Sequence, residues 1–260
     1  MTRTFKLTIA YEGTDFAGWQ VQPGQKTIQS MLERALYRVT KDQIRVIGSG
    51  RTDSGVHALA QVASCTLPSW RDSSDRLAHA LNANLPDTIV VTEAVDAPQD
   101  FHAIRDAIGK RYRYQLQLGG RRDAFEHRYR WHLHGAMDIQ LMRSAASRFV
   151  GQHDFASFQA TGSDRKTTTR DVRACELYPQ QSSDSDAINL LIEVEADGFL
   201  YNMVRNIVGT LVEVGRGKQP PEWIDEVIAA RDRDAAGQTA PAKGLFLLRV
   251  DYNPFASHRA

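Results

Sequence analysis

The residue types best suited to chemistry are gathered in one short segment, residues 48–57. This segment contains three glycines together with Arg51, Asp53 and His57. Because glycine permits positive φ angles and a close approach of backbones, these glycines can hold the side chains between them in a fixed, exposed arrangement. A carboxylate presented in this way can bond to an electron-poor centre or take part in proton transfer. Asp53 is the least expected residue of this segment, and on these residues alone its role can be chemical or structural.

The same segment does not fit two common nucleotide-binding motifs. After Gly48 and Gly50 a dinucleotide fingerprint requires glycine at position 53, where Asp53 stands, and no Gly-Lys-Ser/Thr completes a P-loop. A purely structural role stays open on these residues alone. Aspartate in a glycine-rich turn commonly hydrogen-bonds its own backbone, and Arg51 could pair with Asp53 on the surface.

A second cluster, residues 110–114, alternates basic and aromatic side chains. In an extended strand Tyr112 and Tyr114 share one face, whereas Arg111 and Arg113 share the other. One face can then line a pocket while the other meets phosphates or solvent. Tyr114 is expected in the core, because buried aromatic residues are common in strands.

Hydrophobic periodicity predicts the elements that must position these clusters. In the first half it predicts strands over 5–11, 43–47, 60–67 and 88–92, and helices over 28–39, capped by Thr27, and 75–83. In the second half it predicts strands over 110–118, 170–178, 187–195 and 245–250, helices over 138–150 and 202–214, a short helix opened by Pro220-Pro221, and a polar hairpin loop over 180–186. We therefore predict an α+β protein with two similar βαββαβ-like halves, residues 1–105 and 106–260.

The composition is that of a folded globular protein, with 42% hydrophobic and 24% charged residues among 260. No apolar run approaches the roughly 18 residues that a membrane span requires, and the opening residues lack the apolar core of a signal peptide. A cytoplasmic protein is the expectation. Cys65 and Cys175, the two cysteines, are too few for a disulfide framework and are expected to be buried thiols.

Charge is balanced overall and segregated locally. The formal net charge is +1, but residues 105–130 contain eight basic against three acidic side chains, whereas residues 86–100 contain acidic side chains and no lysine or arginine. A phosphate-rich ligand could use the basic stretch. A solvated basic strand and loop is the plainer alternative.

Residues 50–58, Gly-Arg-Thr-Asp-Ser-Gly-Val-His-Ala, strongly resemble the active-site motif of the tRNA pseudouridine synthase A family. Blocks similar to that family follow in the same order over nearly the whole chain, at residues 11–20, 27–29, 82–86, 100–103, 110–114, 154–158, 203–209 and 239–245. Ser54 stands where alanine is frequent in the family, and residues 166–170 fit less closely. So many blocks in one order are hard to obtain by chance.

This resemblance implies the pseudouridine synthase fold, with the sheets of the two halves meeting around a central basic cleft. It also implies a reaction, the isomerisation of uridine to pseudouridine: the N1–C1′ glycosidic bond breaks and the base rejoins the sugar through C5. No cofactor and no metal ion are implied. Asp53 would be the catalytic carboxylate, either bonding to the electron-poor centre or stabilising or deprotonating the sugar.

The resemblance assigns further residues to the site. A dry pocket alone raises the pKa of a carboxyl group, so a fixed cation is expected beside Asp53, and Arg205 is that cation by resemblance. Tyr112 would stack on the base and act in proton removal. The predicted catalytic residues are therefore Asp53, Tyr112 and Arg205.

The predicted substrate-binding residues are Tyr112, Arg51, His57, Lys110 and Arg111. Arg51 would occupy the stack that a flipped-out uridine vacates. Two roles for His57 stay open: a contact with a phosphate, or closing of the turn. The implied partner is the anticodon stem-loop of tRNA, modified at positions 38–40, with a homodimer that joins two basic faces.

Rival interpretations also follow from the sequence. His127, His132 and His134 have a spacing that could place two metal ligands on one strand face, but few carboxylates lie near them in sequence. The chain could instead be a non-catalytic RNA-binding protein that uses residues 105–130 as a stacking surface. A related pseudouridine synthase acting on another RNA is the third possibility. Asp53 distinguishes an enzyme from a non-catalytic RNA-binding protein, because a protein that only binds RNA gains nothing from a carboxylate near phosphates.

Overall fold

The computed structural model of this chain describes residues 2–160, 162, 167–182, 184 and 186–254. The chain forms two compact units. Unit 1 contains the residues up to Ile108 together with those from Phe246 onward, and unit 2 contains Gly109–Leu245. The predicted boundary between residues 105 and 106 lies three residues before this one, and the residues from Phe246 onward belong to the first unit rather than to the second.

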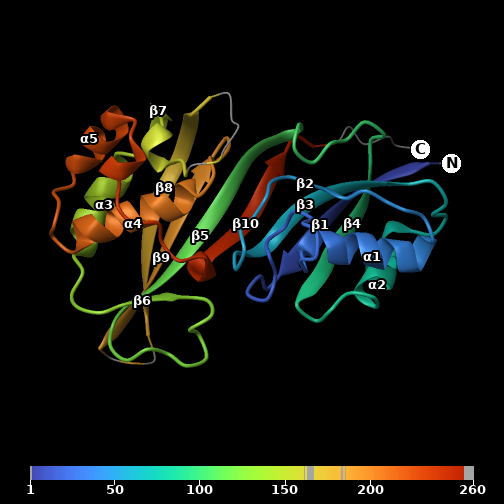
Figure 1. The fold of residues 1–260 in the computed structure, drawn as a ribbon, viewed down its shortest axis with the longest axis horizontal. Helices are drawn as coiled ribbons and strands as arrows, with labels where there is room; N and C mark the ends of the chain where they lie inside the picture. Colours follow the sequence, from blue (N-terminus) through green and yellow to red (C-terminus); the bar gives the residue numbers. More distant parts are fainter. Residues whose placement is uncertain (1, 161, 163–166, 183, 185, 255–260) are drawn as a thin grey trace. The chain divides into compact units, whose positions relative to one another are not determined.

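Unit 1 alternates strands and helices in the order β-α-β-β-α-β, as predicted for the first half. Its elements are β1 (Arg3–Tyr11), α1 (Ile28–Thr40), β2 (Ile47–Gly48), β3 (His57–Leu67), α2 (Ser74–Asn82) and β4 (Ile89–Ala97). The final strand, β10 (Leu245–Tyr252), adds to the same sheet. Within this unit the strand order is β4-β1-β3-β10, and β2 also pairs with β3. Figure 1 shows α1 and α2 running along this sheet.

The pairing around β3 determines where the Asp53 loop begins and ends. β2 pairs antiparallel with β3 through Gly48 and Ala63, and β10 pairs parallel with the start of β3 through Phe246 and His57. The Asp53 loop, residues 49–56, therefore connects two strands that are hydrogen-bonded to each other. Of the predicted strand over 43–47, only its last residue lies in β2.

Local sequence explains the start of α1. Thr27 is the N-cap, as predicted, and it forms a reciprocal capping box with Ser30. Ile28, Leu32 and Leu36 recur at four-residue steps and are buried. This amphipathic pattern holds α1 against the core of unit 1.

Unit 2 is built from β5 (Ala107–Gly119), β6 (Trp131–Leu133), α3 (Ile139–Ser147), β7 (Gly151–Asp154), β8 (Thr169–Gln181), β9 (Ala187–Ala196), α4 (Met203–Gly215) and α5 (Trp223–Ala230), with short 3-10 helices at Ala156–Phe158, Arg233–Ala235 and Ala242–Gly244. The strand order is β5-β9-β8-β7, and β6 pairs parallel with β5. Figure 1 shows α3, α4 and α5 gathered beside this sheet.

The two units repeat one arrangement. In unit 1 the first strand, β1, pairs antiparallel with β3, the second strand of the β2–β3 pair. In unit 2 the first strand, β5, pairs antiparallel with β9, the second strand of the β8–β9 hairpin. A helix follows each of these pairs, α2 in unit 1 and α4 in unit 2. The prediction of an α+β fold with similar halves is confirmed.

Unit 2 also departs from its predicted elements. The predicted helix over 138–150 ends at Ser147, and Val150, the last residue of the predicted range, is 44% exposed. β7 follows directly and was not predicted, because its residues, Gly-Gln-His-Asp, show no apolar alternation. β8 runs on to Gln181, so the predicted hairpin loop over 180–186 is shorter. Ser183 and Ser185 of that loop, like Lys166, lie outside the described residues.

Candidate active site

A tight turn presents Asp53 from the loop between β2 and β3. The amide of Val56 donates to the carbonyl of Asp53 at 3.1 Å, and Gly55 within this turn has φ +78°. A turn of this kind needs a residue that tolerates positive φ at its third position, which is why glycine stands there. Asp53 is half-buried, whereas its neighbour Thr52 is buried. The glycine-rich loop therefore fixes the backbone of Asp53, as its composition predicted.

The segment that follows β1 holds both residues next to Asp53. The amide of Trp19 donates to the carbonyl of Thr52 at 3.0 Å, and the hydroxyl of Ser54 donates to the carbonyl of Phe16 at 3.0 Å. The hydroxyls of Tyr11 and Thr52 are 2.8 Å apart. No pattern in the sequence indicated a role for Tyr11 or Thr52. The structure identifies them as supports of the loop.

Two glycines allow this close packing of one loop on another. A Cβ atom on Gly13 would lie 2.0 Å from the carbonyl oxygen of Val56, and one on Gly18 would lie 2.6 Å from that of Thr52. Such distances leave no space for a side chain. The two glycines after β1 were the available sequence signal, because a backbone that must approach another backbone selects glycine.

His57 closes the turn. Its side chain is 1% exposed, stacks on Phe246 with ring centroids 4.5 Å apart, and accepts a hydrogen bond at Nδ1 from the amide of Gly13 at 3.1 Å. A ring nitrogen that accepts this bond carries no proton, so the 3.6 Å approach of Nδ1 to Glu12 is not an ion pair. Of the two roles left open for His57, this geometry favours the structural one.

Arg51 belongs to the same loop, and its side chain is exposed. An exposed guanidinium on a loop fixed at both ends can reach a ligand without first breaking an internal core contact. The predicted role of Arg51 in filling a vacated base stack stays a prediction.

In unit 2, Tyr112 and Tyr114 lie on one face of β5. Tyr112 is 7% exposed, and its ring meets Phe199 edge-on at 5.0 Å. Tyr114 is fully buried and donates to the carbonyl of Pro241 at 2.7 Å, and burial raises the pKa of its hydroxyl. The prediction that Tyr114 is a core residue is confirmed, and Tyr112 is the one of the pair that retains some exposure.

The opposite face of β5 carries an ion-pair network. Arg111 contacts Glu193 at 2.6 Å, Glu176 at 2.7 Å and Glu195 at 3.1 Å, and Arg113 also pairs with Glu193. Burial alone lowers the pKa of Arg111, but its hydrogen bonds with these carboxylates raise that pKa overall. Three carboxylates, those of Glu176, Glu193 and Glu195, thus offset the positive charge of Arg111.

The ion-pair network on β5 partly neutralises the basic stretch over 105–130. Arg105 pairs with Asp106 at 2.8 Å, and Arg130 pairs with Glu126 at 3.4 Å. These two acidic residues belong to the stretch itself, so the glutamates of β8 and β9 that pair with Arg111 and Arg113 are what reduces its excess of positive charge. Arg111 was expected to contact substrate, yet its charge is offset by side chains of β8 and β9. Lys110 is half-buried, and its role stays a prediction.

Arg205 is fixed at the start of α4. Its Nε donates to the carbonyl of Ala240 at 2.7 Å and its Nη1 donates to Asn202 Oδ1 at 2.9 Å, while its own carbonyl accepts from the amide of Ala240 at 3.1 Å. A Cβ on Gly209 would lie 1.6 Å from the carbonyl oxygen of Gln238. The space beside Gly209 is therefore filled by the backbone segment that also holds the Arg205 guanidinium.

The predicted site residues divide between the two units. Arg51, Asp53 and His57 belong to unit 1, whereas Lys110, Arg111, Tyr112 and Arg205 belong to unit 2. Within unit 2, one backbone segment links two of the clusters: Tyr114 bonds to Pro241 and Arg205 bonds to Ala240. The joint action of Asp53, Tyr112 and Arg205 stays a prediction, as does the basic cleft.

The remaining candidates do not assemble into a metal site. The rings of His132 and His134 are 4.4 Å apart, but His132 Nε2 is hydrogen-bonded to the carbonyl of Gly119 at 3.1 Å. Over the described residues, no three histidine, cysteine, aspartate or glutamate side chains gather to hold a metal ion. Cys65 and Cys175 are buried thiols, as predicted.

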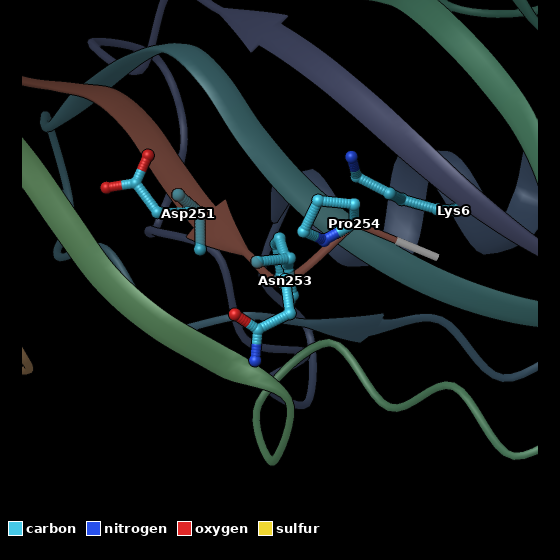
Figure 2. A pocket seen from close by; sticks show the side chains of 6 residues that line it. Lys6, Asp251, Asn253 and Pro254 are labelled. Atoms are coloured by element: carbon cyan, nitrogen blue, oxygen red, sulfur yellow. The ribbon is translucent and has the colours of Figure 1, made fainter. Parts of the chain in front are cut away.

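Figure 2 shows a hollow of about 320 Å³ at the end of β10, lined by Lys6, Val250, Asp251, Tyr252, Asn253 and Pro254. The carboxylate of Asp251 pairs with Arg249 at 3.0 Å, and the Tyr252 hydroxyl donates to the carbonyl of Ala103 at 2.6 Å. None of the predicted site residues lines this hollow. In the part of the chain that the structure describes, no helix has both the length and the apolar character needed to cross a membrane.

Comparisons with known proteins agree over nearly the whole chain. A family model described as tRNA pseudouridine synthase matches residues 7–104 and 145–253. A protein of Acetivibrio thermocellus named tRNA pseudouridine synthase A is 44% identical over 250 residues, which cover 96% of this chain and 100% of that protein. Proteins with the same name from Geotalea uraniireducens and Limosilactobacillus fermentum are 44% identical over 253 residues and 41% identical over 252 residues, covering 96% of this chain and 100% and 96% of the relatives.

The matched residues include the loop that carries Asp53 and the helix that carries Arg205. The match therefore includes residues of both compact units. The alignments with the Acetivibrio thermocellus and Geotalea uraniireducens proteins cover the full length of those relatives. This chain belongs to the family of tRNA pseudouridine synthases, isomerases that convert uridine to pseudouridine.

Proposed function

We propose that this chain converts uridine to pseudouridine at positions 38–40 of the tRNA anticodon stem-loop, with Asp53 as the catalytic carboxylate. Support for tRNA as the substrate comes from the family model and from relatives named tRNA pseudouridine synthase A. Support for Asp53 comes from its position in a loop whose residue types and order match the active-site motif of that family.

The reaction is an isomerisation, so its atoms balance without a second substrate. The N1–C1′ bond of uridine breaks, C5 forms a new bond to C1′, and the proton on C5 is replaced by one on N1. Asp53 either bonds to the electron-poor centre while the uracil turns, or stabilises or deprotonates the sugar. Each role requires an ionised carboxylate whose position does not change while the base moves.

One observation carries the assignment of Asp53. The residue on each side of it is hydrogen-bonded to the segment after β1: the backbone carbonyl of Thr52 accepts from Trp19, and the side-chain hydroxyl of Ser54 donates to Phe16. Such support from both sides is what a catalytic group needs, because an error of about 1 Å in its position costs on the order of 100-fold in rate.

Tyr112 and Arg205 complete the proposed catalytic set. Tyr112 offers an aromatic face against which the detached uracil can stack, and its hydroxyl can take part in removal of the C5 proton. Arg205, held by Ala240 and Asn202, supplies a fixed cation that favours the ionised form of a nearby carboxylate. Arg51 would fill the gap that the flipped uridine leaves in the stem.

The decisive experiment compares Asp53→Asn with Asp87→Asn, the same chemical change at an exposed position of unit 1. We expect Asp53→Asn to abolish pseudouridine formation while tRNA binding is largely retained, and Asp87→Asn to keep both. Pseudouridine is mapped by sequencing after chemical labelling, and binding is measured by fluorescence anisotropy. Turnover by Asp53→Asn would remove Asp53 from its catalytic role.

The substrate position is tested on tRNA in which the uridines at 38–40 are replaced by cytidine. Loss of product on this RNA supports the anticodon assignment, whereas continued product formation at another uridine contradicts it. Binding of tRNA by the unaltered protein without any product would instead favour a non-catalytic RNA-binding protein.

The proposal includes a cytoplasmic homodimer whose two copies bind one tRNA together. In a dimer two basic faces act on one RNA, which strengthens the field that a chain with net charge +1 can offer. Sedimentation velocity with and without tRNA measures this directly. A monomer at concentrations that support full activity would exclude the dimer from the mechanism.

A further inference from the structure

The loop between β5 and β6, residues 119–130, carries the most exposed large apolar side chain that the structure describes. We name it the Phe125 loop. Phe125 is 90% exposed, whereas Leu59, the next in exposure, is 51% exposed. Figure 1 shows this green loop beside the ends of β8 and β9, where the amide of Arg121 donates to Asp184 at 2.9 Å. A single exposed apolar side chain is common on protein surfaces, so the backbone that presents this ring and the charges near it decide whether it can serve as a binding site.

The loop that carries Phe125 is held by its own hydrogen bonds. The side chain of Gln117, 3% exposed, donates to the carbonyl of Arg121 at 2.5 Å and accepts from the amide of Asp123 at 3.2 Å. Asp123 in turn accepts from the amides of Phe125 at 2.8 Å and Glu126 at 3.2 Å. The backbone at Phe125 is therefore fixed from within, and the ring is presented outward by a built turn.

Charge around the ring is positive toward solvent. The carboxylate of Asp123 is used by backbone amides, and that of Glu126 pairs with Arg130 at 3.4 Å. Arg121 and Arg122, four and three residues before Phe125, are both exposed. The loop thus offers one aromatic face with guanidinium groups close to it in sequence, whereas its acidic groups are already engaged.

We propose that the Phe125 loop binds an unpaired nucleotide of the RNA substrate, with the base stacked on Phe125 and flanking phosphates paired with Arg121 and Arg122. An aromatic face beside cations is the common chemistry for binding unpaired RNA without reading its sequence. Phenylalanine and arginine are also enriched in protein interfaces, so the test must separate RNA from a second copy of this chain. The inference rests on the proposed function only in taking RNA as the ligand.

The test measures the Kd of the full-length protein for tRNA by fluorescence anisotropy. We expect Phe125→Ala to weaken binding about tenfold, within the range for loss of one stack between a base and an aromatic side chain. Phe125→Trp keeps the affinity because it restores a stacking face, whereas Phe125→Leu does not. The double variant Arg121→Gln/Arg122→Gln reduces the slope of log Kd against log salt by about 1.4, the expectation for two phosphate contacts on a single strand.

The matched control is Val150→Ala, which shortens an apolar side chain of unit 2 that is 44% exposed; its Kd should not change. A Kd for Phe125→Ala within twofold of the unaltered protein would overturn the inference, as would full affinity of Phe125→Leu. Sedimentation velocity tests whether a second copy of this chain contacts the ring instead of RNA. Separation of a dimer into monomers by Phe125→Ala would show that contact and overturn the inference. Pseudouridine formation by the unaltered protein, measured in the same preparation, tests the proposed function separately.

Discussion

The surroundings of Asp53 in unit 1 and of the cations in unit 2 are built in opposite ways. Around Asp53, neutral groups fix the backbone: the hydroxyl of Tyr11, the amide of Trp19 and the imidazole of His57 bind the loop or the segment packed on it. In unit 2, the charged side chains are themselves bound, as in the hydrogen bonds of Arg205 and the ion pairs of Arg111.

The two units should therefore be sensitive to different kinds of substitution. A neutral hydrogen-bonded loop fails when its geometry is altered, whereas an ion-pair network fails when one charge is removed and its partners are left uncompensated. The following changes test that comparison, beginning with the largest expected effect.

Gly13→Ala should have the largest effect. Its Cβ would lie 2.0 Å from the carbonyl oxygen of Val56, so one backbone must move and Asp53 moves with it. We expect a loss of activity of about 100-fold or more, because catalytic geometry is sensitive to about 1 Å. The matched control is Gly198→Ala, whose Cβ meets Arg170 at an ordinary 3.6 Å. Equal activity of the two variants would show that the loop contact does not position Asp53.

Arg111→Gln should lower the free energy of unfolding at pH 7 by about 2 kcal/mol, because it removes the cation that Glu176, Glu193 and Glu195 share. Arg113→Gln is the comparison, since Arg113 pairs with Glu193 and is more exposed than Arg111. Urea unfolding measures both. If Arg111 instead binds RNA, its loss will reduce the salt dependence of tRNA binding more than it reduces stability.

Each unit carries one buried thiol, and alkaline pH should destabilise both. Burial raises the pKa of Cys65 and Cys175 from 9.0 to about 12. As pH rises past 9, unfolded thiols lose their protons while folded ones keep them, so the free energy of unfolding falls by about 1.4 kcal/mol per pH unit for each thiol until pH reaches about 12. Between pH 8 and 11, the free energy of unfolding of Cys65→Ala and of Cys175→Ala should fall less steeply with pH than that of the unaltered protein. An unchanged slope in either variant would place that thiol in contact with water.

Tyr11→Phe should have the smallest effect on stability, about 1 kcal/mol, through loss of one buried hydrogen bond to Thr52. Thr52→Val should cost a similar amount, and the double variant less than the sum, because it removes both polar groups together. Unfolding energies and activity are measured for all four proteins of this cycle. Strict additivity would mean that the two hydroxyls do not act as a pair.

Local patterns predicted those features that depend on neighbours in sequence. Thr27 was identified as a cap, and the two faces of β5 were separated correctly at Tyr112 and Arg111, because helix caps and strand alternation are properties of a few consecutive residues. The glycines around Asp53 likewise indicated a constrained turn, and Gly55 takes up the positive φ that such a turn needs.

Features that depend on distant segments could not be predicted in this way. The partners of Arg111 are 65 to 84 residues away in sequence. The backbone that fills the space at Gly209 comes from Gln238. No periodicity within 10 or 20 residues contains such information, since it arises only when strands pair and loops pack.

The sequence by itself determined the fold class, the order of elements in the first half, and Asp53 as the residue to which chemistry was assigned. Only the tertiary structure decided that His57 supports a backbone amide, that Arg111 is balanced by carboxylates, that β10 returns to unit 1, and that Phe125 is exposed. The physical reason is the separation in sequence over which each kind of interaction acts. Capping, alternation and turn formation act between near neighbours, whereas burial and charge compensation depend on which distant groups the folded chain brings together.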